Sequence, residues 1–82
     1  MNRIKLLFFA TLRERAGMRS LNLEISEDLT IQGLKNKLAQ EYPNLAPSMS
    51  SVLVSIDREY AFDETVIPQN AEIALFPPVS GG

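Results

Sequence analysis

The hydrophobic and polar residues at the start of the chain follow the pattern of two β-strands. Residues 3–10 are rich in Ile, Leu and Phe, which predicts a first strand. Apolar and polar residues then alternate, so one face of a second strand carries Leu21, Leu23 and Ile25. We expect the two strands to form a hairpin, joined by a one-turn helix that a capping box of Thr11 and Glu14 opens and Gly17 closes.

The middle of the chain has the period of an amphipathic helix. Apolar residues recur every three or four positions, at Ile31, Leu34, Leu38 and Tyr42. Thr30 can cap this helix and Pro43 ends it, although Gly33 near its start is a poor helix former. The apolar stripe of this helix needs a sheet face to cover it.

Three further strands are expected in the second half. Apolar residues at every second position predict a third strand with Val52, Val54 and Ile56 on one face. A short strand is expected near residues 60–62 and a final strand at residues 72–76, with the turn formers Pro68 and Asn70 between them.

The predicted order is ββαββ with a short extra strand. One main helix on one face of a mixed sheet is an α+β arrangement, and the ubiquitin-like β-grasp is the small fold that fits this order best. We therefore expect a β-grasp domain at residues 1–76 and a flexible, extended C-terminal tail at residues 77–82.

The sheet face that the helix leaves uncovered is a candidate protein interface. In a β-grasp the first and last strands are parallel neighbours at the sheet centre, so their outward residues form one apolar patch, which Tyr60 extends: Leu7, Phe9, Ala74 and Phe76. A one-residue slip in register would instead turn these side chains inward.

The tail is the candidate reactive segment. Pro77 and Pro78 restrict the backbone, while Gly81 and Gly82 lack Cβ and can pass through a narrow channel. The carboxylate of Gly82 is sterically open, so a nucleotide-using partner could adenylate it and a sulfur donor could displace AMP to leave a thiocarboxylate. A terminal Gly-Gly pair alone would also fit a frayed end.

Composition removes several other chemistries. The 82 residues include no His and no Cys, which excludes disulfides, the usual zinc sites, thiol nucleophiles and imidazole acid-base catalysis. A net charge of -2 gives no general attraction to nucleic acid. Residues 1–19 nevertheless carry five basic residues and one acidic residue, which indicates either an acidic partner surface or a solvated basic edge.

The first fifteen residues resemble a signal peptide in their basic start and apolar stretch, but they lack its other features. The apolar stretch from Leu6 to Leu12 is far shorter than the ~20 residues that span a bilayer, and charged residues follow it at once. We expect a cytoplasmic protein that binds no membrane.

Two segments, FFATLRE (residues 8–14) and FPPVSGG (residues 76–82), resemble the small subunit of molybdopterin synthase, the sulfur-carrier family of molybdenum cofactor biosynthesis. The resemblance implies a non-catalytic carrier with no stably bound cofactor, adenylated at its last Gly by an ATP-dependent E1-like enzyme and then loaded by a sulfur donor protein. It implies transfer of sulfur to cyclic pyranopterin monophosphate within a heterotetramer of two small and two large subunits.

The resemblance also assigns roles to residues. Gly82 matches the residue that is adenylated and thiocarboxylated. Gly81 matches the residue that passes with it into the partner's channel. Positions at the partner interface match Phe9, Arg13 and Phe76, whereas Tyr60 stands where the family usually has an aliphatic residue. Two other classes stay open: a carrier or modifier for another pathway, such as thiamin synthesis or tRNA thiolation, and, less favoured, a free-standing enzyme.

Overall fold

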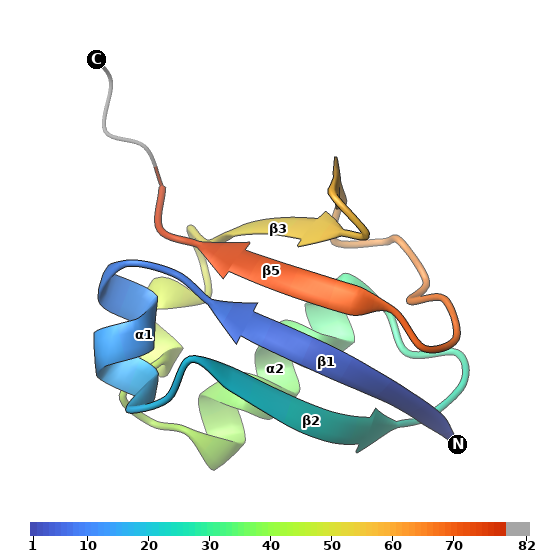
Figure 1. Ribbon diagram of the computed structural model, residues 1–82, viewed down its shortest axis with the longest axis horizontal. Coiled ribbons are helices and arrows are strands. Elements are labelled where there is room, and N and C mark those ends of the chain that lie inside the picture. Colours follow the sequence, from blue (N-terminus) through green and yellow to red (C-terminus); the bar gives the residue numbers. More distant parts are fainter. Residues whose placement is uncertain (79–82) are drawn as a thin grey trace.

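The computed structural model describes residues 1–78 as a five-stranded sheet with one main helix across one face (Figure 1). The strands are β1 (Asn2–Phe8), β2 (Ser20–Ile25), β3 (Leu53–Ile56), β4 (Glu59–Tyr60) and β5 (Glu72–Phe76). The helices are α1 (Thr11–Ala16), α2 (Ile31–Glu41) and the short 3-10 helix η1 (Ala46–Ser48). The predicted α+β, ubiquitin-like β-grasp architecture is confirmed, and the short strand lies slightly before the range 60–62.

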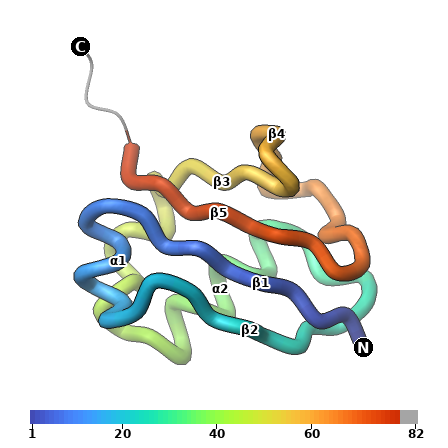
Figure 2. Tube along the Cα trace, in the orientation of Figure 1, coloured from blue at the N-terminus to red at the C-terminus, as the bar shows by residue number. Residues whose placement is uncertain are grey.

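The sheet has the strand order β2-β1-β5-β3-β4 (Figure 2). The first and last strands, β1 and β5, are parallel neighbours at its centre, and the other pairs are antiparallel. Leu7 is registered with Ala74, and Phe8 with Leu75. The predicted pairing of the first two strands and the central place of the last strand are therefore confirmed.

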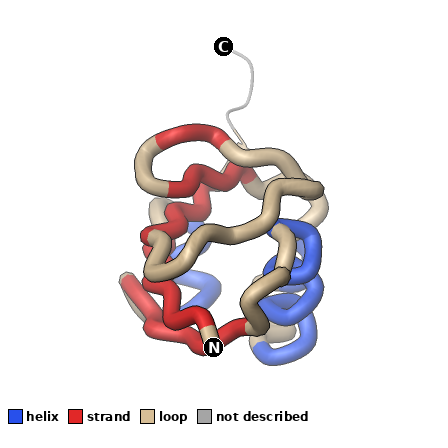
Figure 3. Tube along the Cα trace, turned by 90° about the vertical axis from the view of Figure 1, so that its right-hand side faces the viewer, coloured by secondary structure: helices blue, strands red, loops and turns tan. Residues whose placement is uncertain are grey.

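The core lies between the sheet and α2, which Figure 3 shows as two layers. Alternate residues of the central strands and the apolar stripe of the helix are buried against one another: Ile4, Leu6, Phe8, Ile73, Leu75, Ile31, Leu34 and Leu38. Burying each such side chain contributes roughly 1.5–3 kcal/mol. The sheet register predicted from the sequence is therefore confirmed, and the outward residues of β1 and β5 lie on the opposite face.

The N-terminus of α2 is capped as predicted. The Thr30 hydroxyl accepts a hydrogen bond from the Gly33 backbone nitrogen at 3.2 Å. A Cβ atom at Gly33 would lie 2.5 Å from Leu29 Cδ1. The residue that weakens helix propensity therefore makes room for the Leu29 side chain.

The beginning of α1 differs from the prediction. Its N-cap is Ala10, whose methyl side chain cannot accept a hydrogen bond, and Thr11 already lies inside the helix, so the predicted capping box is wrong. The chain reverses directly after β1, because Phe9 N donates to Leu75 O and Leu12 N donates to Phe9 O. This reversal puts Ala10 at φ 52, whereas Gly17 closes the helix at φ 74 as predicted.

Replacing Ala10 with Gly should stabilise the fold. A non-glycine residue at such a backbone angle costs of order 1–3 kcal/mol, and glycine loses roughly 0.5–1 kcal/mol in backbone entropy on folding. We expect the free energy of unfolding to rise by about 1 kcal/mol, measured by urea denaturation. The control Ala39→Gly, inside α2, should lower it by about 1 kcal/mol, and a loss of stability in both variants would contradict the strain at Ala10.

A buried Asn at the start of β1 holds the segment that leads into β5. Asn2 Nδ2 donates to Pro68 O at 2.8 Å, and Asn2 Oδ1 accepts from Asn70 N at 2.8 Å. Asn2 is fully buried, so these bonds replace the water that its amide would otherwise bind. The two bonds join Asn2 to residues 66 and 68 positions later in the chain, and they fix where β5 enters the sheet beside β1.

Residues 1–78 contain no helix long and apolar enough to cross a membrane. Over the same residues, no three His, Cys, Asp or Glu side chains gather where they could hold a metal ion. β5 ends at Phe76, and Pro77 and Pro78 follow outside any helix or strand. The division into a domain and a tail at residue 76 stays a prediction.

Candidate functional site

The uncovered face of the sheet carries a shallow hollow of about 380 Å³. We call it the outer-face hollow, and eight residues of β1, β3, β4 and β5 and the segments beside them line it: Leu7, Phe9, Ser55, Arg58, Tyr60, Glu72, Ala74 and Phe76. All four outward residues predicted from strand alternation are among them, and so is Tyr60, which was expected to extend the patch. The structure thus gathers the predicted apolar patch into one concave surface.

Two stacked aromatic rings form one end of the hollow. The ring centroids of Phe9 and Phe76 are 4.7 Å apart and the ring planes differ by 12°. Phe9 is 41% exposed, while Phe76 is half-buried, so the pair shows an apolar surface to solvent. A backbone hydrogen bond holds the Phe9 backbone beside β5, because Phe9 N donates to Leu75 O at 3.2 Å, next to Phe76. Stacked pairs contribute about 0.5–1.5 kcal/mol beyond their burial, so this surface is preformed.

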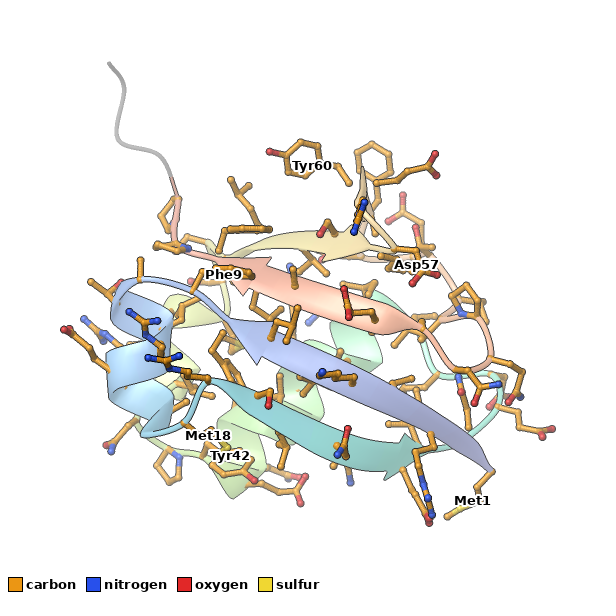
Figure 4. All side chains as sticks on the ribbon, viewed as in Figure 1. Met1, Phe9, Met18, Tyr42, Asp57 and Tyr60 are labelled. Carbon is orange, nitrogen blue, oxygen red and sulfur yellow. The ribbon has the colours of Figure 1, made fainter. Side chains whose placement is uncertain are left out.

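The opposite side of the hollow is the β3–β4 turn. Asp57 and Arg58 occupy its two central positions at φ 48 and φ 76. Tyr60 follows on β4 with 76% of its surface exposed, and Figure 4 shows it at the edge of the sheet, with Phe9 over the end of β5. Its predicted place beside the apolar patch is confirmed, while its role in docking stays a prediction.

Three residues that line the hollow were given no role at this site by the sequence: Ser55, Arg58 and Glu72. Arg58 reaches the site because a two-residue turn with positive φ brings it back over the sheet. The sequence signal was the polar stretch from Asp57 to Glu59 directly after an apolar strand. Such a stretch is typical of a turn, but it does not report the direction in which the side chains of the turn point.

Arg13 lies on α1 and is exposed, and it is not among the residues that line the hollow. Pro77 is partly buried and Pro78 is exposed, and both directly follow Phe76. The tail therefore begins at the same end of β5 that carries the stacked rings. The predicted reactive residues, Gly81 and Gly82, lie outside the described residues.

A second apolar surface adjoins the first. A further hollow of about 370 Å³ is lined by Lys35, Val52, Leu53, Val54, Tyr60, Ala61 and Phe62. Phe62 is 71% exposed and was given no role by the sequence analysis. Lys35 Nζ lies 2.6 Å from Asp63 Oδ1, which ties α2 to the loop after β4. Tyr60 borders both hollows.

One carboxyl with a shifted pKa, that of Glu24, lies outside the outer-face hollow. The Arg3 guanidinium donates a hydrogen bond to Glu24 Oε1 at 2.8 Å and holds the pKa of that carboxyl below its ordinary value, but this pair links β1 to β2, outside the hollow. The hollow offers aromatic rings, the hydroxyl groups of Ser55 and Tyr60, and two opposite charges. This set suits the docking of a protein surface and includes no imidazole or thiol for catalysis.

Comparison with known proteins places the chain in a family. The ThiS family model matches residues 6–82. The molybdopterin synthase sulfur carrier subunit of Arabidopsis thaliana is 34% identical over 79 residues, covering 96% of this chain and 82% of that protein. Several other curated relatives with the same description are 28–35% identical.

Solved structures agree with the fold. SAMP1 from Haloferax volcanii has a TM-score of 0.83 and 28% identity, covering 99% of this chain and 100% of that one. One chain in a complex of subunits 1 and 2 of molybdopterin-converting factor from Helicobacter pylori has a TM-score of 0.69 and 20% identity, covering 98% and 99%. The chain belongs to the ThiS family, with the ubiquitin-like β-grasp fold and with molybdopterin synthase sulfur carrier subunits among its relatives.

Proposed function

We propose that this protein is the sulfur carrier subunit of molybdopterin synthase and that Gly82 is its reactive residue. In this proposal the Gly82 carboxylate is adenylated with ATP by an E1-like enzyme. A sulfur donor protein then displaces AMP, and the thiocarboxylate gives its sulfur to cyclic pyranopterin monophosphate. The observation that supports the proposal is an apolar hollow with two stacked rings beside the start of a Pro-Pro and Gly-Gly tail, in a chain similar to known carriers.

The proposed partner is the large subunit of the synthase, in a heterotetramer of two small and two large subunits. Holding the tail in a partner's active site costs roughly 1–2 kcal/mol per residue in backbone entropy, so contacts elsewhere must offset it. The outer-face hollow supplies aromatic contacts for this purpose, next to the first residue of the tail. The Helicobacter pylori neighbour, solved as a complex of two subunits, is consistent with this partnership.

The chain acts in this proposal as a donor, with the catalytic side chains in the large subunit. Its sequence contains no His or Cys, and no cofactor is expected to bind stably. ATP enters only through the activating enzyme, and the adenylate is transient. We place these steps in the cytoplasm, the reducing compartment in which thiols persist.

A second candidate function is a carrier or protein modifier of another pathway. The likeness to SAMP1 favours this function, because SAMP1 stands for small archaeal modifier protein 1. In that case the activated carboxyl of Gly82 would be joined to lysine side chains or serve another sulfur acceptor. The β-grasp fold and the tail serve both functions equally, so the chemistry at Gly82 must separate them.

Mass spectrometry separates the two functions. Incubation with the activating enzyme, ATP and a sulfur donor should raise the mass of the chain by about 16 Da, because sulfur replaces one oxygen, and no shift should occur without ATP. The loaded chain should then convert cyclic pyranopterin monophosphate to molybdopterin with the large subunit. Attachment of the chain to lysines, with no such conversion, would support the modifier reading instead.

A further inference from the structure

The outer-face hollow carries charge at one end only. Within residues 1–78, the charged side chains that line it are those of Arg58 and Glu72. Both lie near the β3–β4 turn, away from the stacked rings of Phe9 and Phe76. A surface that meets this hollow must therefore satisfy charge at one end and fill apolar space at the other.

The backbone holds Arg58 in an unfavourable conformation. Its φ of 76 lies in the left-handed region, where a side chain raises the energy and Gly or Asn is the usual residue. Strained positions of this kind gather at sites where the conformation serves a function. The side chain that causes the strain is the one that reaches the hollow.

The turn that presents Arg58 is fixed to the sheet. Asp57 N donates to Glu72 O at 2.9 Å, and Glu72 N donates to Asp57 Oδ1 at 3.0 Å. These two bonds tie the turn to the first residue of β5. The backbone that carries Arg58 is therefore fixed before a partner binds, which lowers the backbone entropy lost on binding.

The two charges differ in their surroundings. Glu72 is registered with Lys5 of β1, so an opposite charge lies beside it on the same face of the sheet. The four ion pairs formed within residues 1–78 do not include Arg58. Glu72 is in none of these ion pairs either, so the two charges differ in that Glu72 has an opposite charge in register, whereas Arg58 lies in the turn between the paired residues of β3 and β4.

We propose that Arg58 selects the partner by binding a carboxylate of the large subunit, set beside apolar side chains that cover Phe9 and Phe76. The inference rests on the proposed function. A guanidinium suits this task because its planar fork can donate two hydrogen bonds to one carboxylate and can stack on an aromatic ring. The partner surface is therefore acidic at one end and apolar at the other.

The substitution Arg58→Gly tests the proposal, because its two expected effects have opposite signs. The melting temperature of the free chain should rise by about 3 °C or more, since glycine accepts the positive φ without strain. The affinity for the large subunit, measured by calorimetry, should fall about tenfold, and the loss should shrink at high salt. Arg58→Lys should recover only part of the affinity, because the ammonium lacks the planar fork.

The matched control is Arg3→Ala, which removes one positive charge from the β1–β2 side of the sheet, outside the hollow. It should leave the affinity unchanged. Equal affinities of Arg58→Gly and the natural chain would overturn the role of Arg58 while keeping the proposed function. Equal losses in Arg58→Gly and Arg3→Ala would reduce the effect to net charge and overturn it as well. Failure of the natural chain to bind the large subunit would overturn the proposed function and this inference together.

Discussion

Deleting Gly82 is expected to abolish sulfur transfer and leave the folded domain unchanged. The deletion moves the terminal carboxyl back by about 3.3–3.6 Å, the length of one extended residue. A misplacement of 1 Å at a reacting group can already cost about a hundredfold in rate, so we expect at least that loss. The measurement is conversion of cyclic pyranopterin monophosphate by the large subunit, with the thiocarboxylate followed by mass spectrometry.

The same deletion should not change stability. Within residues 1–78, every buried residue of the core precedes Phe76, so the free energy of unfolding should stay within about 0.5 kcal/mol of the natural chain. Ser80→Ala is the control, because it changes the tail without changing its length or its last residue. A shortened chain that still transferred sulfur at the natural rate would contradict the assignment of Gly82.

The substitution Phe76→Asp is expected to weaken binding to the large subunit about a hundredfold. It removes one of the two stacked rings of the outer-face hollow and puts a carboxylate into an apolar contact, where a lost aromatic anchor costs about 2–4 kcal/mol. Because Phe76 is half-buried against Phe9, we also expect the free energy of unfolding to fall by about 1 kcal/mol. Binding is measured by calorimetry and folding by circular dichroism.

Phe62→Asp is the matched control for this prediction. It makes the same chemical change at an exposed aromatic residue that does not line the outer-face hollow. It should leave the affinity for the large subunit unchanged. Equal weakening by both substitutions would show that the outer-face hollow is not the docking surface, and an unfolded Phe76→Asp variant would contradict the outward direction of this residue.

Most of the fold could be predicted from local patterns. Strand alternation identified the buried residues of β1 and β5, and the period of the apolar residues identified α2 and its Thr30 cap. These predictions succeed because a half-buried strand and an amphipathic helix each show their buried face in the sequence. The capping box at Thr11 failed because the hydrogen bond from Phe9 N to Leu75 O controls where the chain turns. That bond joins residues far apart in the sequence, and no local pattern reports it.

The candidate site divides in the same way. The sequence by itself determined the apolar outward residues, the absence of His and Cys and the Pro-Pro and Gly-Gly tail, because side-chain type and alternation need no knowledge of distant neighbours. Only the tertiary structure decided that Phe9 stacks on Phe76, that Asn2 holds the entry to β5, and that Arg58 turns back over the hollow. Each of these contacts depends on the parallel pairing of β1 with β5 or on the turn anchored to it. Such pairings form when the whole core is buried together, so their geometry belongs to the fold as a unit.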